Sequence, residues 1–274
     1  MDEREVRYFI FKPITPEMIV SGFSNRDRFD RMRRVNWIDV DSIHKTRCLV
    51  VGAGALGNEA VKDLVLAGFR DITIVDMDDI VVSNLSRCLF FRESDVKKAM
   101  KANIVAERAS ELDPEVNIRP LSIRIQDLDE WDFDIILGCL DNISARMHTN
   151  SHAYYYGIPY VDGATDGLYG KVQVVLPNGP CLQCTMNRSH IREMEKRFTC
   201  TGSGSTYVPK IASDITTTSV IAGIQVREVM KIVSGRADMC IRHVSYYDGN
   251  KGEMFTVEAT IDKECQNHIY ERTK

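Results

Sequence analysis

The sequence lacks the features that would place a protein in a membrane or on a nucleic acid. No apolar stretch approaches the roughly 20 residues of a membrane-spanning helix, and the N-terminus is charged where a signal peptide would be apolar. No run of lysine or arginine is longer than a pair, and the formal net charge is -4. This charge pattern excludes an extended nucleic-acid surface. We expect a soluble, cytoplasmic protein with no membrane and no nucleic-acid partner.

A disulfide framework is also missing, although the chain has eight cysteines. Such frameworks belong to secreted proteins, and no secretory signal is present. Cys48 and Cys139 stand inside apolar runs, and Cys88 and Cys240 have no neighbouring feature that suggests chemistry. We predict that most of the cysteines are small buried packing residues or metal ligands.

The order of apolar patterns predicts the fold class. From residue 47 to residue 160, short apolar runs alternate with longer amphipathic stretches, which is typical of a doubly wound sheet with helices on both faces. The predicted fold class is therefore α/β, a Rossmann-like and mostly parallel sheet with C-terminal antiparallel strands. As a separate expectation, residues 1–46 form an N-terminal helical arm. Strands are expected at 47–52, 72–76, 116–122, 134–138, 159–162, 172–176, 242–248 and 253–260, and helices at 55–68, 97–112, 143–156 and 213–233.

A glycine loop separates the first predicted strand from the first predicted helix. Gly52, Gly54 and Gly57 form the pattern G-x-G-x-x-G, and the next strand ends in Asp76. Glycines let a nucleotide approach the backbone, and a helix N-terminus offers unpaired N–H groups to phosphate. The acid about 20 residues beyond the loop suits a ribose hydroxyl. Taken alone, this spacing favours NAD, with a tight turn that binds nothing as the alternative.

The residues after Asp76 point to a different nucleotide. Residues 76–87 read D-x-D-x-x-x-x-S-N-L-x-R, and residues 139–142 read C-x-D-N at a predicted strand end. In this order the motifs resemble the ubiquitin-like-protein activating enzymes, the ThiF-type adenylyltransferases, which include the activators of molybdopterin- and thiamine-type sulfur carriers. The resemblance covers about residues 27–268. It implies that residues 47–274 form an adenylation domain that binds ATP.

The resemblance also implies roles for individual residues. It assigns Asp76 to the ATP ribose and Asp141 to a Mg²⁺ ion that bridges the phosphates, a metal that prefers hard carboxylate ligands. Arg31 resembles an arginine that reaches the active site of a second copy, so a homodimer is implied. The remaining nucleotide-site residues are Asp78, Asn84, Arg87, Lys101 and Asn142.

Several of these residues have ordinary structural alternatives. Asp141 and Asn142 could cap the helix that follows, Arg87 and Lys101 could be surface charges, and Arg31 could belong to a basic helical face. The family's glycine and proline before the lysine are missing in residues 95–101, and the segment is longer by one residue. Lys98 is therefore a possible stand-in for Lys101.

Two pairs of metal-ligand residues stand far apart in the chain. Cys181 and Cys184 have a two-residue gap, and Cys265 and His268 repeat it near the C-terminus. Two such pairs can close a tetrahedral site, so we predict structural Zn²⁺, with a redox pair or ordinary thiols as the alternative. The resemblance supports this prediction, because many family members carry cysteine pairs at both places.

One cysteine separates two possible functions. Cys200 lies in a mobile segment predicted at about 185–210, where catalytic subunits of the eukaryotic activating enzymes have their nucleophile. Lys196 and Arg197 could favour its thiolate. The alternative is an exposed loop thiol without a role.

The function that the resemblance implies has two steps. The first is adenylation of the C-terminal carboxylate of a ubiquitin-like or sulfur-carrier protein that ends in Gly-Gly, and the second is thioester formation on Cys200. A conjugating enzyme is a possible further partner. The alternatives are a sulfur-carrier adenylyltransferase without a thioester, an NAD-dependent oxidoreductase and a zinc-stabilised binding module. The chain ends soon after the second metal pair, so we expect a minimal activator without a ubiquitin-fold domain.

Overall fold

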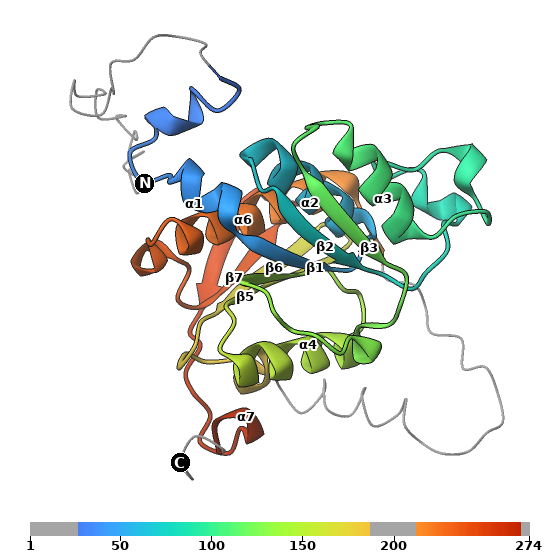
Figure 1. The fold of residues 1–274 in the computed structure, drawn as a ribbon. Helices are drawn as coiled ribbons and strands as arrows, with labels where there is room; N and C mark the ends of the chain where they lie inside the picture. The colour runs from blue at the N-terminus through green and yellow to red at the C-terminus, as the bar shows by residue number, and fades with distance from the viewer. Residues whose placement is uncertain (1–26, 187–211, 270–274) are drawn as a thin grey trace, which may run out of the picture.

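The computed structural model describes residues 27–186 and 212–269 and is built around an eight-stranded sheet (Figure 1). The strand order is β3-β2-β1-β4-β5-β6-β7-β8. Neighbours from β3 to β5 pair in parallel, and those from β5 to β8 pair antiparallel. The predicted fold class is confirmed. The strands are β1 (Arg47–Val51), β2 (Asp71–Val75), β3 (Asn117–Leu121), β4 (Ile135–Gly138), β5 (Tyr160–Asp166), β6 (Tyr169–Val175), β7 (Val244–Asp248) and β8 (Glu253–Val257).

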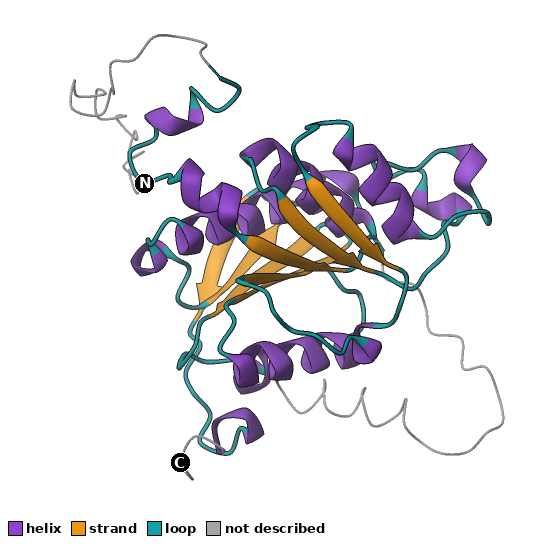
Figure 2. Cartoon of the chain, in the orientation of Figure 1, coloured by secondary structure: helices purple, strands orange, loops and turns teal. Residues whose placement is uncertain are grey.

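Helices cover both faces of the parallel part of the sheet. One face carries α1, α2, α3 and α6, and the other carries α4 (Figures 1 and 2). The α-helices are α1 (Val40–Lys45), α2 (Ala55–Ala67), α3 (Lys101–Ser110), α4 (Ile143–Tyr156), α6 (Ile215–Val233) and α7 (Gln266–Ile269). Short 3-10 helices are η2 (Met32–Arg34), η3 (Val82–Asn84), η4 (Glu93–Asp95), η5 (Ile125–Asp127), η6 (Leu182–Thr185) and η7 (Ala237–Met239).

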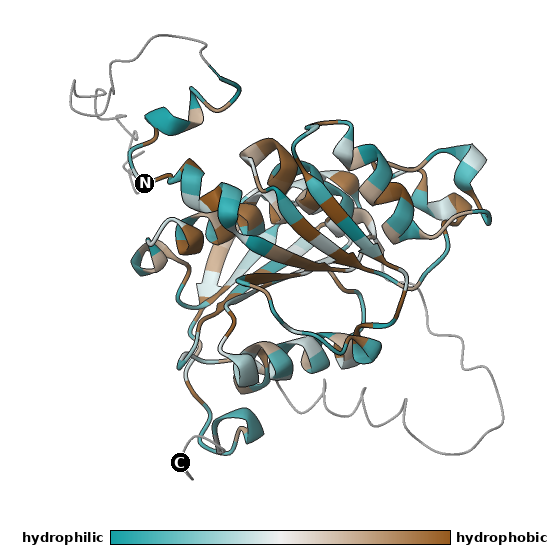
Figure 3. Cartoon of the chain, viewed as in Figure 1, coloured by the Kyte–Doolittle hydropathy of each residue, from teal (hydrophilic) through white to brown (hydrophobic). Residues whose placement is uncertain are grey.

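Burial on two faces explains why the inner parallel strands β1 and β4 are nearly continuous apolar runs. In β1, Val50 packs into the core beneath α2 and α6, whereas Leu49 packs into the core beneath α4. Figure 3 shows the hydrophobic colour along these inner strands and in stripes on the helices. A strand covered on both sides has no solvent-facing positions, so it does not alternate between apolar and polar residues.

The helix predicted at 97–112 is wrong at its start, because α3 begins at Lys101. Lys97 has a positive φ of 58°, which lies outside the helical region. Met100 pairs with Asp79 in an isolated antiparallel bridge. The chain is therefore held in a turn until Met100, and Lys101 stands in the first turn of α3.

The glycine-rich stretch after Asp162 forms a hairpin of β5 and β6, both longer than predicted. A Cβ on Gly163 would lie 2.3 Å from the Gln225 side chain, and one on Gly170 would lie 2.3 Å from Ile221. Both neighbours belong to α6. The glycines therefore let α6 pack closely on the two strands.

At its N-terminal end the description begins with η2 and α1, so most of the predicted arm over 1–46 lies outside the described residues. Asp39 caps α1 by accepting hydrogen bonds from the backbone of Asp41 and Ser42. None of the described helices is both long and apolar enough to cross a membrane.

Candidate functional site

The glycine loop is shaped by two close backbone approaches. Gly52 has a φ of 102° and donates its N–H to the Val75 carbonyl at 2.8 Å. A Cβ on Gly57 would lie 1.9 Å from the Gly52 carbonyl oxygen, whereas one on Gly54 would meet nothing within 4 Å. Gly54 is the N-cap of α2. The first and third glycines are thus required by packing, and the second leaves open space at the N-terminus of α2.

This geometry predicts opposite outcomes for two matched substitutions. Gly57→Ala should lower the free energy of unfolding by at least about 2 kcal/mol, because the new methyl group would overlap a backbone carbonyl that cannot move away. Gly54→Ala should change it by less than about 1 kcal/mol. Urea unfolding measures both. Equal stabilities of the two variants would contradict the steric account.

Asp76 holds the glycine loop from the C-terminal end of β2. Its carboxylate accepts a hydrogen bond from the Ala53 N–H at 2.7 Å and another from the Asp78 N–H at 2.9 Å. Burial raises the pKa of Asp76, against the opposing effects of Lys101 and these two backbone donors. Asp76 therefore connects the loop to the segment that follows β2.

Lys101, and not Lys98, lies near the carboxylates of Asp76 and Asp78. Lys101 Nζ is 2.7 Å from an oxygen of Asp78, and the lysine side chain is 11% exposed. Burial acts to lower the pKa of Lys101, but Asp76, Asp78 and Asp141 outweigh that effect, so its pKa is raised. Lys98 is exposed. The late start of α3 places the ammonium group of Lys101 next to the acids at the sheet edge.

Asn84 and Arg87 shape the turn between β2 and α3. Asn84 is buried, and its Oδ1 accepts the Val81 N–H at 3.0 Å. The Arg87 guanidinium donates to the Ser83 carbonyl. Arg87 is half-buried, so part of the group remains accessible to a ligand.

Asp141 and Asn142 follow β4, whose carboxyl end meets those of β1 and β2 at the same edge of the sheet. Asn142 caps α4, and its Oδ1 accepts the Ala145 N–H at 2.7 Å. The helix-capping role considered for Asn142 is therefore confirmed. Asp141 is exposed and close enough to Lys101 to raise the pKa of the lysine. Arg31 is exposed and is the N-cap of η2.

A buried ion pair beside this edge was missed by the sequence reasoning. Arg146 in the first turn of α4 pairs with Asp162 of β5, which is 0% exposed. The Tyr160 hydroxyl donates to the same carboxylate at 2.8 Å. An acid inside an apolar strand was the available signal, because a buried carboxylate requires a partner. The pair ties α4, and hence the Asp141 loop, to the sheet.

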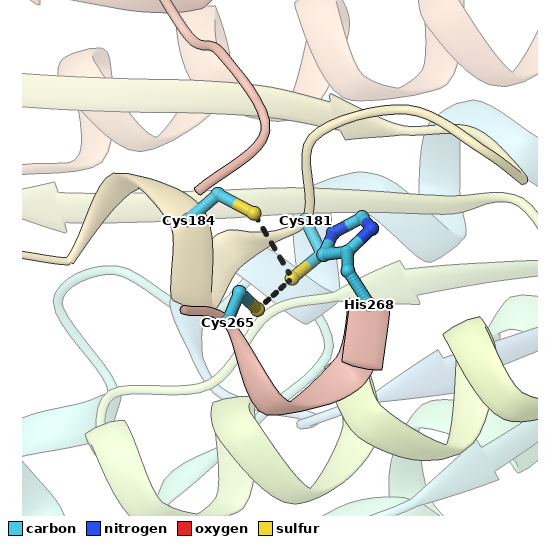
Figure 4. Close-up of side chains that lie close together, drawn as sticks. All are labelled: Cys181, Cys184, Cys265 and His268. Carbon is cyan, nitrogen blue, oxygen red and sulfur yellow. Dashed lines mark hydrogen bonds between the residues drawn. The ribbon is translucent and has the colours of Figure 1, made fainter. Parts of the chain in front are cut away.

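The four predicted metal ligands come together in one cluster (Figure 4). Their ligand atoms all lie within 4.8 Å of one another. Cys181 Sγ is 3.8 Å from Cys184 Sγ and 3.6 Å from Cys265 Sγ. A tetrahedral zinc ion with bonds of about 2.3 Å would hold its sulfurs about 3.8 Å apart. The donor set and its spacing therefore fit Zn²⁺.

Hydrogen bonds around the cluster orient two of its ligands. Asn267 donates to Cys181 Sγ at 3.4 Å, and the Tyr154 hydroxyl lies 2.8 Å from Nδ1 of His268. Burial acts to raise the pKa of Cys181, but the hydrogen bonds from Asn267 and the Cys184 backbone lower it overall. A lowered thiol pKa at Cys181 and a fixed imidazole at His268 both suit a metal site.

Of the remaining cysteines, four are buried and one lies outside the described residues. Cys48, Cys88, Cys139 and Cys240 are buried, and none of the described cysteines forms a disulfide. Their predicted packing role is confirmed. Cys200, with nearly all of the segment predicted at 185–210, lies outside the described residues.

Comparison with known proteins identifies related sequences and folds. The NEDD8-activating enzyme E1 catalytic subunit of Arabidopsis thaliana is 42% identical over 157 residues, covering 51% of this chain and 34% of that protein. The SUMO-activating enzyme subunit 2 of Dictyostelium discoideum is 35% identical over 150 residues, covering 53% and 22%. The chain spans about a third or less of the length of these relatives.

Solved structures share the fold at lower identity. E. coli MccB crystallised with ATP superposes with a TM-score of 0.72 at 17% identity, covering 90% of this chain and 76% of that chain. PaaA gives a TM-score of 0.65 at 19% identity and 86% coverage of both chains. A sequence model described as the ThiF family matches residues 30–267, which include the sheet, the glycine loop and three of the four cluster ligands. This chain therefore belongs to the ThiF family.

Proposed function

We propose that this chain uses ATP to adenylate the C-terminal carboxylate of a ubiquitin-like protein. The observation that carries the proposal is the group of charged residues at one sheet edge: Asp76 under the glycine loop, Lys101 at the start of α3 and Asp141 after β4. The names of the relatives, which include NEDD8- and SUMO-activating enzymes, supply the class of substrate. A related fold has been crystallised with ATP.

The surroundings of each residue suit a particular role in binding ATP. Gly54 and the N-terminus of α2 offer open space and unpaired N–H groups to phosphate. Asp76 would accept the ribose hydroxyls, and Lys101 would neutralise charge on the phosphates, with Asn84 and Arg87 on the turn beside it. The exposed carboxylate of Asp141 is a hard oxygen ligand that fits Mg²⁺, which when bound neutralises phosphate charge.

The chemical step transfers AMP to the carrier. A carboxylate oxygen of the carrier attacks the α-phosphorus of ATP, the bond from that phosphorus to the bridging oxygen breaks, and pyrophosphate leaves with the electron pair. The product is an acyl-adenylate. Lys101 stabilises the charge that develops on the phosphate oxygens, because it stands at the site with a raised pKa and stays protonated at neutral pH.

The first test is exchange of labelled pyrophosphate into ATP. We expect carrier-dependent exchange with a ubiquitin-like protein ending in Gly-Gly and none with the same protein shortened by the two glycines. Exchange that is absent with every such carrier would contradict the proposal. Displacement of a bound nucleotide by NAD, but not by ATP, would instead support an oxidoreductase.

The second proposed step is transfer of the acyl group to Cys200. Its thiolate would attack the acyl carbon, forming a thioester and releasing AMP. The position of Cys200 between the two halves of the metal cluster and the kinship with an E1 catalytic subunit support this step. We further propose a homodimer in which the exposed Arg31 reaches the second copy.

Non-reducing gels test the thioester. Wild-type protein incubated with ATP and carrier should give an adduct that reducing agent removes, and Cys200→Ala should give none while retaining pyrophosphate exchange. Cys240→Ser is the matched control, because Cys240 is buried and should leave the adduct intact. Exchange without an adduct in the wild type would favour a sulfur-carrier adenylyltransferase.

The metal cluster is proposed to hold a structural Zn²⁺. Four protein ligands form a closed set, whereas a catalytic zinc site keeps one position for water or substrate. Cys265 and His268 come from the segment after β8 that ends in α7. Cys181 and Cys184 come from the start of η6 and from η6 itself, after β6. A bound ion would therefore fasten the C-terminal segment to the body of the domain.

A further inference from the structure

A buried asparagine joins the glycine loop to the segment that carries Asn84 and Arg87. Asn58 lies in the first turns of α2 and is 0% exposed. Its Nδ2 donates to the carbonyls of Ala53 and Gly54, both at 2.9 Å. Its Oδ1 accepts the N–H of Phe90, 32 positions along the chain, at 3.0 Å. The bonds to Ala53 and Phe90 are buried, and the bond to Gly54 is partly buried.

The orientation of this amide follows from its partners. Ala53 and Gly54 present carbonyl oxygens, which only accept, and Phe90 presents an N–H, which only donates. The nitrogen of Asn58 must therefore face the loop and its oxygen must face Phe90. Apart from glutamine, whose chain is longer by one methylene, no other side chain offers two donors and one acceptor in this arrangement without a charge.

The carbonyl group of Phe90 is bound by Arg108 of α3. The guanidinium of Arg108 donates to the Phe90 carbonyl and forms a two-pronged ion pair with Asp95, at 2.6 and 2.8 Å. Asp95 in turn accepts the Arg92 N–H at 2.7 Å. The segment between η3 and α3 is thus fastened to α2 by Asn58 and to α3 by Arg108.

The contacts form one continuous path across the candidate nucleotide site. Asp76 holds the N–H of Ala53, Asn58 holds the carbonyl of Ala53 and the N–H of Phe90, and Arg108 holds the carbonyl of Phe90. We propose that Asn58 is a positioning residue that fixes the spacing between the glycine loop and the turn bearing Asn84 and Arg87. This inference rests on the proposed use of ATP, whose phosphates would bind between those two elements.

Kinetics of Asn58→Leu test the inference. Leucine has the same number and branching of side-chain heavy atoms and removes all three hydrogen bonds. We therefore expect the KM for ATP in pyrophosphate exchange to rise about tenfold or more, with the KM for the carrier changed less than about twofold. Ala60→Gly is the control, because it weakens the same helix at a buried position and leaves the Asn58 amide untouched. Equal KM values for ATP in the two variants would overturn the inference.

Hydrogen exchange without nucleotide gives an independent readout. The Phe90 N–H should exchange at least about tenfold faster in Asn58→Leu than in Ala60→Gly, because only the first loses the acceptor. If wild-type protein exchanges no pyrophosphate, the proposed function fails, and unchanged protection of Phe90 would separately overturn the link. If Asn58→Leu does not fold, Arg108→Lys, which loses the two-pronged pair, must raise the KM for ATP, and an unchanged KM would refute the positioning role.

Discussion

Pyrophosphate exchange should fall about 100- to 1,000-fold when Lys101 is replaced by alanine, a loss typical of removing one electrostatic stabiliser of a transition state. Lys101 is the lysine that stands at the sheet edge, with Nζ 2.7 Å from Asp78 and only 11% of its side chain exposed. Asp76 and Asp141 are near enough to raise its pKa. Its charge is therefore available where charge would build up on the α-phosphate.

Lys98→Ala is the matched control for this prediction. Lys98 is exposed and lies three positions before Lys101, and among the described residues it is Lys101 that forms an ion pair with Asp78. Its loss should change exchange by less than about twofold, as expected of an isolated surface charge. A large loss in Lys98→Ala with normal exchange in Lys101→Ala would show that Lys98, and not Lys101, is the phosphate ligand.

The other large effect concerns the metal cluster. Purified protein should contain one zinc ion per chain, and Cys265→Ser should release it and lower the Tm by about 10 °C or more. Cys265 Sγ is 3.6 Å from Cys181 Sγ, inside the ligand cluster. Without the ion, the C-terminal segment would lose the link that its ligands form with Cys181 and Cys184. Metal analysis and thermal unfolding measure the two effects.

Cys240→Ser separates loss of a ligand from loss of a buried thiol. Cys240 is also buried, but its thiol donates to the carbonyl of Glu228, away from the cluster. The Cys240→Ser variant should retain the zinc ion. His268→Cys should retain it as well, since four cysteines also form a structural site. Full zinc content and an unchanged Tm in Cys265→Ser would disprove a structural metal here.

The inner part of the parallel sheet was predictable because β1 and β4 are buried on both faces. Runs such as residues 48–51 contain no polar position, and only a covered strand allows this. The start of α3 was not predictable from residues 97–100, which are compatible with a helix. It is decided by the bridge of Met100 to Asp79 and by the Arg108 to Asp95 pair, which join residues far apart in the chain.

The same contrast separates the parts of the candidate site. The sequence shows Asn142 next to Asp141 but cannot show that one caps α4 while the other stays exposed. It shows Asn58 in a helix after the glycine loop without any sign that its amide bonds to Phe90. The cap formed by Asn142 and the bond from Asn58 to Phe90 both depend on how neighbouring elements are placed in three dimensions. Local sequence patterns carry no information about that placement.

By itself the sequence determined the order of elements, the glycine loop and the two metal-ligand pairs. Each of these is a local pattern, set by side-chain size, backbone freedom or a two-residue gap between ligands. Only the tertiary structure decided which distant groups meet: Cys181 with Cys265 across 84 positions, and Lys101 rather than Lys98 with Asp78. Those meetings depend on how α3, α4 and the C-terminal segment pack on the sheet, because burial and hydrogen bonding act between elements that are remote in the chain.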